Sequence, residues 1–254
     1  MKKTTCFCLL FSCFLFGYVA NAQNVIDKGK DQVKYFNAHQ FYLGENYSAA
    51  LKLYKELEVE HPADASIMFN IGACYLKDDD IPNAIEYLEK AKAKDPKADD
   101  YLDMDLGLAY QQNGDIDKAI TEYTTFKTTF AKKESKLKDS RVDYYLDQCN
   151  TAKALMAKPA NVKIENMGQA INSEFDDKTP SISADGRTFI FNSRRPNGVN
   201  SAVDKEGDGK YFEKIYISQW DTVNNKWMDA EMIPGSINAE GHDACCSLSP
   251  KSRR

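Results

Sequence analysis

One acidic loop of the sequence has the residue types and spacing of a cation-binding site. The loop reads Asp204-Lys-Glu206-Gly-Asp208-Gly, so carboxylates recur at alternate positions before a glycine that permits a tight turn. Oxygen ligands with this spacing can surround a hard cation such as calcium. The third position holds Glu, however, and the twelfth holds Ile215 where a calcium-binding loop has Glu. Two interpretations stay open: a calcium site formed by Asp204, Glu206 and Asp208, or a solvated loop between two strands.

The other reactive residues do not indicate catalysis. The sequence has no nucleophile elbow, no glycine-rich phosphate loop and no H-E-x-x-H motif. Cys74 and Cys149 fall on helical patterns, where a thiol usually packs as a small apolar group. For the adjacent Cys245 and Cys246, a vicinal disulfide, free thiols and intermolecular pairing all remain open. We therefore expect no enzyme and, calcium aside, no cofactor.

The first 22 residues predict export. Lys2 and Lys3 precede an apolar run, and Ala20-Asn21-Ala22 forms an A-x-A cleavage signal. The run is about fourteen residues long, shorter than the roughly 20 residues of a spanning helix, which favours a cleaved signal peptide over a membrane anchor. The net charge is −5 without a basic cluster, so we expect no nucleic-acid partner.

After the predicted signal peptide, one sequence segment occurs three times and sets the predicted order of helices. Its copies occupy residues 42–54, 76–88 and 111–123, at offsets of 34 and 35 residues. Each copy places a small residue four positions before a bulky one on a predicted helix. A fixed period of this length predicts stacked pairs of helices. The pairs are Ala50 with Tyr54, Ala84 with Leu88, and Ala119 with Tyr123.

The pattern resembles the tetratricopeptide repeat. In the second and third repeats an apolar residue is followed by Gly (Gly72, Gly107), then by Tyr three positions on and by Ala nine positions after that; the first repeat has Ala38 and Phe41 at the matching positions, and Pro62 and Pro96 end the first two units. The resemblance implies an all-α solenoid over residues 24–157. Its repeats would span about 31–64, 65–98 and 100–133, and a helix at 140–157 would cap the last apolar face.

The same resemblance implies a partner-binding groove on the concave face, lined by the first helix of each repeat. The best-known groove of the family clamps a C-terminal carboxylate with Lys, Arg and Asn, whereas the matching positions here hold Tyr35, His39, Asn70, Tyr101 and Asp105. We therefore expect an apolar peptide or helix instead of a clamped carboxylate. Alternatively, several of these aromatic residues pack between repeats. The implied groove residues are Tyr35, His39, Tyr42, Phe69, Asn70, Ala73, Met104, Leu108 and Gln111.

The character of the sequence changes at Lys158-Pro159-Ala160, after which short β-prone runs alternate with turn residues. Asp185-Gly186 predicts a tight hairpin turn. A second internal repeat lies here, because residues 171–187 match residues 237–253 without a gap at an offset of 66. The predicted strands cover residues 162–167, 180–183, 188–193, 213–221 and 226–233.

This all-β half, residues 161–254, resembles the WD40-like propeller repeat (PD40) of the TolB and OmpA-associated type. One four-stranded sheet per period is typical of propeller blades, which usually number four to eight. The sequence holds one blade and the start of the next, so we expect an incomplete propeller and a chain that is an N-terminal fragment. The alternative is a small β domain that closes on the helical array.

The order of leader, repeats and propeller resembles the N-terminal half of the OmpA-family envelope proteins of Bacteroidetes, including PorE-like components associated with type IX secretion. The resemblance implies a non-enzymatic periplasmic scaffold that joins protein partners at the outer membrane. It implies peptidoglycan binding only where an OmpA-like domain follows. Two other hypotheses remain: the substrate-binding half of a TolB-propeller-type peptidase, and a calcium-dependent binding module.

Overall fold

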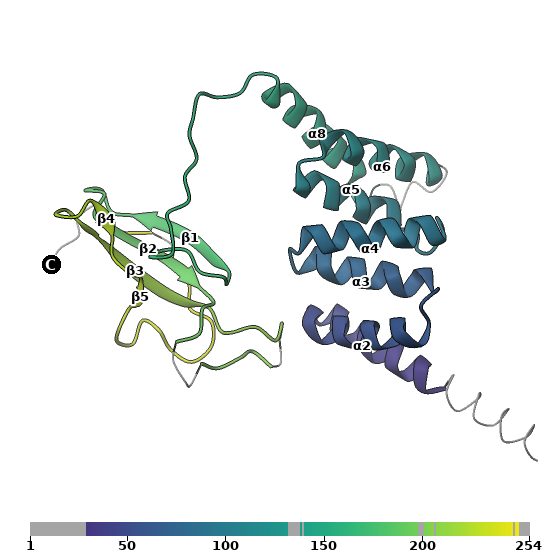
Figure 1. The fold of residues 1–254 in the computed structure, drawn as a ribbon, viewed down its shortest axis with the longest axis horizontal. Helices are drawn as coiled ribbons and strands as arrows, with labels where there is room; N and C mark the ends of the chain where they lie inside the picture. Colours follow the sequence, from purple (N-terminus) through teal and green to yellow (C-terminus); the bar gives the residue numbers. More distant parts are fainter. Residues whose placement is uncertain are drawn as a thin grey trace, which may run out of the picture. The chain divides into compact units, whose positions relative to one another are not determined.

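The computed structural model describes residues 29–131, 138, 140–197, 201–205, 207–245 and 247–248. The predicted signal peptide, Glu206 and Cys246 lie outside the described residues. The chain divides into two compact units, Met1–Pro159 and Ala160–Arg254; the first is helical and the second is built on an antiparallel sheet (Figure 1). Among the described helices, none combines the length and the apolar character that crossing a bilayer requires.

The helical unit is a stack in which each helix packs on the next (Figure 1). Side-chain caps start three of the helices: Asn46 Oδ1 accepts the Ala49 N–H at 3.1 Å, and Asp64 and Asp80 cap the next two in the same way. The caps satisfy backbone donors that a helix end leaves unpaired. The helices span residues 29–43, Tyr47–Glu60 (α2), Ala65–Lys77 (α3), Ile81–Lys94 (α4), Leu102–Asn113 (α5), Ile116–Thr129 (α6) and Val142–Met156 (α8).

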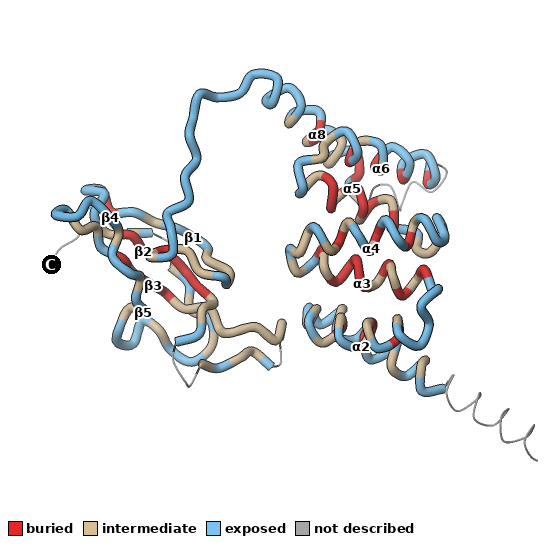
Figure 2. The backbone as a smooth tube through the Cα atoms, in the orientation of Figure 1, coloured by how far each residue is buried: buried red, intermediate tan, exposed pale blue. Residues whose placement is uncertain are grey.

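The small residues of the repeated segment are where helices touch most closely. A Cβ atom built on Gly72 would lie 2.7 Å from Leu88 Cγ, and one on Gly107 would lie 2.6 Å from the Tyr123 ring. The alanines and bulky residues predicted to pair are all fully buried. Figure 2 shows buried positions recurring along α3, α4, α5 and α6. Close approach of this kind needs residues without bulk on one helix surface. The stacked helix pairs predicted from the sequence period are confirmed.

The last helix, α8, packs against α6 and covers the end of the stack. Val142 and Cys149 are fully buried within the same core as Tyr123. Tyr145 stacks on the Tyr123 ring with centroids 5.7 Å apart. This arrangement removes from water the apolar surface that a further repeat would otherwise cover.

The second unit is an antiparallel sheet. Strands β1 to β4 follow one another across the sheet in chain order, and β5 pairs with β3. The hairpin turn at Asp185-Gly186 forms as predicted: Gly186 adopts φ 71°, and its N–H donates to the Ser183 carbonyl at 2.9 Å. The strands are Asp177–Ile182 (β1), Thr188–Ser193 (β2), Lys214–Asp221 (β3), Lys226–Trp227 (β4) and Glu231–Met232 (β5).

One face of this sheet carries a small aromatic core. Phe191 lies opposite Tyr216 across the β2–β3 pair, and their rings stack at 6.1 Å between centroids. Phe189 and Ile171 complete the buried cluster, with Trp227 packed against it. Aromatic side chains bury large areas, which stabilises a sheet this small. The propeller itself stays a prediction, since the described strands make one sheet.

Two strand predictions are wrong. Residues 162–167 form no strand; Val162 and Ile164 are 72% and 93% exposed, and the segment ends in a turn in which Asn166 Oδ1 accepts the Gly168 N–H at 2.7 Å. β-propensity without a partner strand does not form a sheet. The run 226–233 is divided into β4 and β5, because the Ala230 N–H between them donates to the Ala170 carbonyl.

Candidate functional site

The first helices of successive repeats meet on one side of the stack. Asn70 Nδ2 of α3 donates to the Tyr35 hydroxyl of the helix over residues 29–43 at 2.8 Å, and α3 in turn packs on α5. Stacks of such repeats curve, so the side that the first helices line is concave. We call this side the first-helix face. It is formed by Tyr35, His39, Tyr42, Asn70, Asp105, Leu108 and Gln111.

The first repeat contributes aromatic side chains to this face. Tyr35 is 37% exposed and rests edge-on against the buried Tyr54, with ring centroids 5.6 Å apart. His39 is exposed and stacks on the half-buried Tyr42 at 6.3 Å. Rings held in this way lose little conformational freedom when a ligand packs on them.

Three residues implied for the groove lie in the core instead. Phe69 and Met104 are 8% and 4% exposed, and both belong to the main core cluster of the helical unit. Ala73 is 3% exposed. These side chains hold α3 and α5 against their neighbours and present little surface to a partner.

Gln111 joins α5 to the last helix. Its Oε1 accepts the Tyr123 hydroxyl at 2.7 Å, and its Nε2 donates to Gln148 Oε1 of α8 at 3.1 Å. Leu108 is half-buried and packs against the core from the same helix. The amide of Gln111 is thus already hydrogen-bonded, whereas Leu108 keeps some apolar surface open.

Asp105 is a charged group of the face, at a position where the sequence departs from the carboxylate clamp of the family. Burial raises the pKa of its carboxyl to about 7; the Lys77 charge lowers this pKa and Asp99 raises it. Burial also raises the pKa of Tyr42, and the negative charge of Asp105 adds to the effect. A carboxyl in this environment is poorly solvated when ionised. The sequence signal that pointed to Asp105 was its match to a position of the family's carboxylate clamp.

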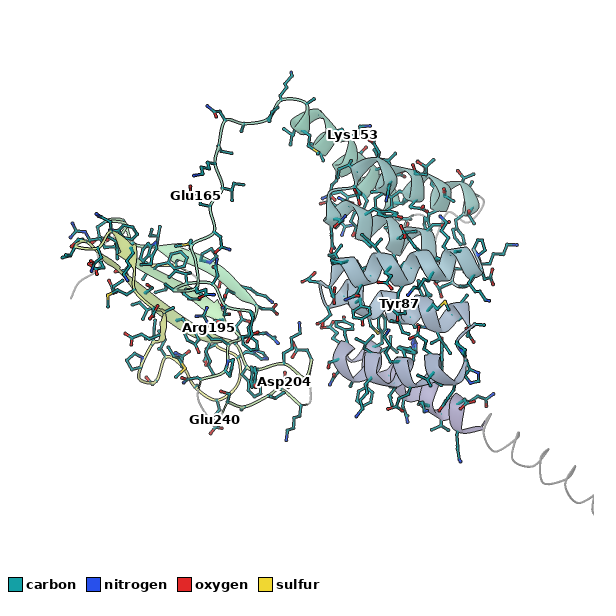
Figure 3. All side chains as sticks on the ribbon, in the orientation of Figure 1. Tyr87, Lys153, Glu165, Arg195, Asp204 and Glu240 are labelled. Atoms are coloured by element: carbon teal, nitrogen blue, oxygen red, sulfur yellow. The ribbon has the colours of Figure 1, made fainter. Side chains whose placement is uncertain are left out.

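The acidic loop of the second unit is held by its own contacts. Asp204 is labelled in Figure 3. Its Oδ1 accepts the Gly207 N–H at 2.8 Å, and its Oδ2 lies 3.3 Å from His242 Nε2. Asp208 pairs with the Arg194 guanidinium. A guanidinium beside one carboxylate competes with a metal for it. The calcium hypothesis for Asp204, Glu206 and Asp208 therefore rests on the sequence pattern.

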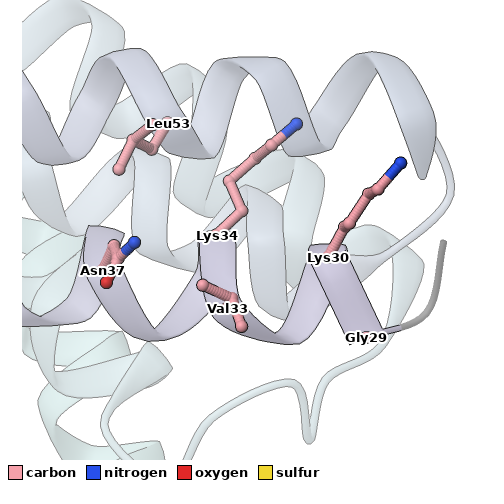
Figure 4. Close-up of a pocket in the computed structure, with 6 residues that line it drawn as sticks. All are labelled: Gly29, Lys30, Val33, Lys34, Asn37 and Leu53. Carbon is pink, nitrogen blue, oxygen red and sulfur yellow. The ribbon is translucent and has the colours of Figure 1, made fainter. Parts of the chain in front are cut away.

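Two further features lie near the start of the helical unit. A shallow pocket between the helix over residues 29–43 and α2 is lined by Gly29, Lys30, Val33, Lys34, Asn37 and Leu53 (Figure 4). Asp31, Glu60 and His61 bring possible ligand atoms within 4.8 Å of one another. Lys34 Nζ lies 2.8 Å from Glu60 Oε1, so an ammonium already neutralises part of this cluster.

The comparisons with known proteins agree with the helical architecture. Models of the tetratricopeptide repeat match residues 39–99 and residues 104–126. The helical unit carries tetratricopeptide repeats. Repeats of this family are protein-interaction modules. Among curated proteins, no significant match to the chain is found.

Several solved structures are similar to about half of the chain. The type III secretion translocator chaperone SycD of Yersinia enterocolitica is 22% identical over 49% of this chain and 86% of its own, with a TM-score of 0.45. The TPR2B-domain–pHsp70 complex of yeast Sti1 is 20% identical over 48% and 97%, with a TM-score of 0.44. The Sgt2 TPR domain of Aspergillus fumigatus is 20% identical over 55% and 91%, with a TM-score of 0.45.

Proposed function

We propose that this chain is a non-enzymatic scaffold that binds a peptide segment of a partner protein on its first-helix face. The observation that carries the proposal is that buried and exposed residues of the repeats form two separate sets. The small and bulky residues of the repeated segment are buried between helices, while the exposed aromatic and amide side chains of successive first helices share one side. A continuous face of this kind suits an extended or helical segment better than a small molecule.

The test is selection of binding peptides from a phage-displayed random twelve-residue library on the full chain. The affinity of a selected peptide is then measured by fluorescence anisotropy against a face variant, Tyr35→Ser with His39→Ala. The matched control is Phe36→Ala with Gln40→Ala, at the next positions of the same helix and therefore rotated by about 100°. We expect the face variant to weaken binding at least tenfold and the control to leave it unchanged. Equal losses in both variants, or no selected peptide, would overturn the proposal.

We further propose that the protein works outside the cytoplasm, in the periplasm and in association with the outer membrane. The leader with its A-x-A site supports export. The resemblance to OmpA-family envelope proteins supports a role in cell-envelope assembly, in type IX secretion or in attachment to the cell wall. Cell fractionation with N-terminal sequencing tests this; the mature protein should begin at Gln23 and cofractionate with the outer membrane.

The sheet of the second unit is proposed to be one blade of a WD40-like propeller. The antiparallel order of β1 to β4 and the recurrence of residues 171–187 at an offset of 66 residues support this proposal. A blade leaves sheet edges to pair with neighbouring blades. Hydrogen–deuterium exchange of the backbone amides of β1 tests it, because an edge strand without a neighbouring blade exchanges fast whereas one paired with another blade is protected.

A further inference from the structure

Asp105 lies on α5, the first helix of the third repeat. Its negative charge contributes to the raised pKa of Tyr42 in the first repeat and of Tyr123 in the third. The residue is half-buried. Within the part of the chain that the structure describes, its carboxyl has no hydrogen-bond or ion-pair partner, in contrast to Asp103 on the same helix, which pairs with Lys92 at 2.9 Å.

The charges around Asp105 are mostly of the same sign. The negative charge of Asp99 raises the pKa of Asp105, and the charges of Asp99 and Asp64 raise the pKa of the Tyr35 hydroxyl. The positive charge of Lys77, at the end of α3, lowers the pKa of Asp105. The Lys77 side chain is exposed and thus solvated. The first-helix face is therefore acidic as well as aromatic.

A poorly solvated carboxylate without a partner raises the free energy of the unbound protein. A cation that reaches it gains a charge-assisted hydrogen bond and relieves that penalty. The half-buried ring of Tyr42, whose hydroxyl the Asp105 charge affects, offers cation–π attraction for the same group. Charge complementarity of this kind selects among partners more than it raises overall affinity.

We propose that the first-helix face takes a peptide segment whose Lys or Arg side chain pairs with the carboxylate of Asp105, flanked by apolar or aromatic residues that pack on Tyr42 and Leu108. This inference rests on the proposed function and adds the chemistry of the partner. The ligand is a basic, amphipathic segment and not an acidic C-terminal tail.

The experiment uses the peptides selected from the random library on the full chain. The strongest selected sequence is synthesised in its own form and with each Lys or Arg replaced by Gln. Binding of these labelled peptides is measured to the wild-type chain, to Asp105→Asn and to Asp103→Asn. Asp103→Asn removes the same charge from the same helix and serves as the matched control. We expect enrichment of one basic position, at least a tenfold weaker interaction after either Lys→Gln in the peptide or Asp105→Asn, and no additional loss when the two are combined.

The outcomes separate this inference from the function beneath it. Selected peptides that lack a basic position, yet lose affinity in the face variant, would overturn the pairing with Asp105 and leave peptide binding intact. Equal weakening by Asp105→Asn and Asp103→Asn would also overturn it, because the effect would then be general electrostatics. Peptides unaffected by the face variant would overturn the proposed function itself.

Discussion

Asp177 and Asp243 hold two loops of the same local geometry, 66 residues apart. Asp177 Oδ2 accepts the N–H of Ser173 at 2.7 Å, and Asp243 Oδ2 accepts the N–H of Ala239 at 2.9 Å, each four positions earlier in the chain. Each carboxylate also meets a cation: Arg195 lies 2.8 Å from Asp177, and Lys214 lies 2.7 Å from Asp243. The repetition in the sequence is thus a repetition of a loop structure.

Replacing Asp177 with Asn should destabilise the second unit. Although burial raises the pKa of this carboxyl, hydrogen bonds from Ser193, Arg195 and the Ser173 N–H lower it overall. Loss of the charge weakens these bonds and should reduce the free energy of unfolding at pH 7 by about 1–3 kcal/mol. Both tryptophans of the chain, Trp220 and Trp227, lie in this unit, so denaturant unfolding followed by tryptophan fluorescence isolates the effect.

The pH dependence of that effect has a defined sign. A folded-state pKa below the ordinary 3.8 means that the contribution of Asp177 is present above about pH 4 and is lost as pH falls through the folded value. The difference between wild type and Asp177→Asn should therefore shrink in acid. Asp229→Asn, at an exposed position of the same unit, is the control and should unfold like the wild type. A difference that persists unchanged at pH 2 would contradict the role of the ionised carboxylate.

Adding one methyl group at Gly107 should destabilise the repeats. The new Cβ atom would lie 2.6 Å from the Tyr123 ring, closer than carbon atoms can approach, so the α5–α6 contact must open. Overpacking of this kind lowers stability by about 1–3 kcal/mol. Thermal unfolding followed by helical circular dichroism measures it. Gly29→Ala, where nothing lies within 4 Å, is the control; an equal melting temperature for Gly107→Ala and wild type would contradict the close packing.

The helical repeats were predictable from the sequence because small and bulky residues such as Gly107 and Tyr123 must recur at a fixed period for helices to pack. The same spacing predicts the side of the helix on which a residue lies only to within about one position. The family resemblance places Phe69, Ala73 and Met104 in the groove, whereas the structure buries them between helices. Asp105 could be placed on the face, but its missing partner depends on side chains from several helices. The strand at residues 162–167 was wrong because propensity cannot supply a neighbour.

Asp105→Asn should stabilise the protein in neutral and basic solution. Burial raises the folded-state pKa of Asp105 to about 7, whereas the ordinary value is 3.8. Below pH 4 the carboxyl is protonated in both states and carries no penalty; as pH rises towards 7 only the unfolded chain releases the proton freely, so stability falls. Because the side chain is half-buried and partly screened by solvent, we expect a gain of about 1–2 kcal/mol at pH 8 and none at pH 4.

The measurement for this prediction is the difference in free energy of unfolding between wild type and Asp105→Asn, taken by urea denaturation at both pH values. Asp103→Asn serves again as the control, since it loses the ion pair with Lys92 and should not become more stable at pH 8. A loss of stability in Asp105→Asn at pH 8 would indicate that the carboxylate has a favourable partner in the folded protein.

The thiols of Cys74 and Cys149 should resist alkylation as long as the repeats stay folded. Both side chains are buried, at 1% and 0% exposure, and burial raises the pKa of Cys74 to about 12 and that of Cys149 above its ordinary value. Because the thiolate is the nucleophile, a thiol with a pKa near 12 is ionised in only about one molecule in ten thousand at pH 8. The half-buried Cys245 should react with iodoacetamide at least a hundredfold faster.

Mass-spectrometric mapping of the labelled peptides distinguishes the three sites in one sample. Cys74 and Cys149 should become reactive at the urea concentration at which the helical circular dichroism signal is lost. Labelling of either site at the Cys245 rate in native buffer would contradict the burial of these thiols in the repeats.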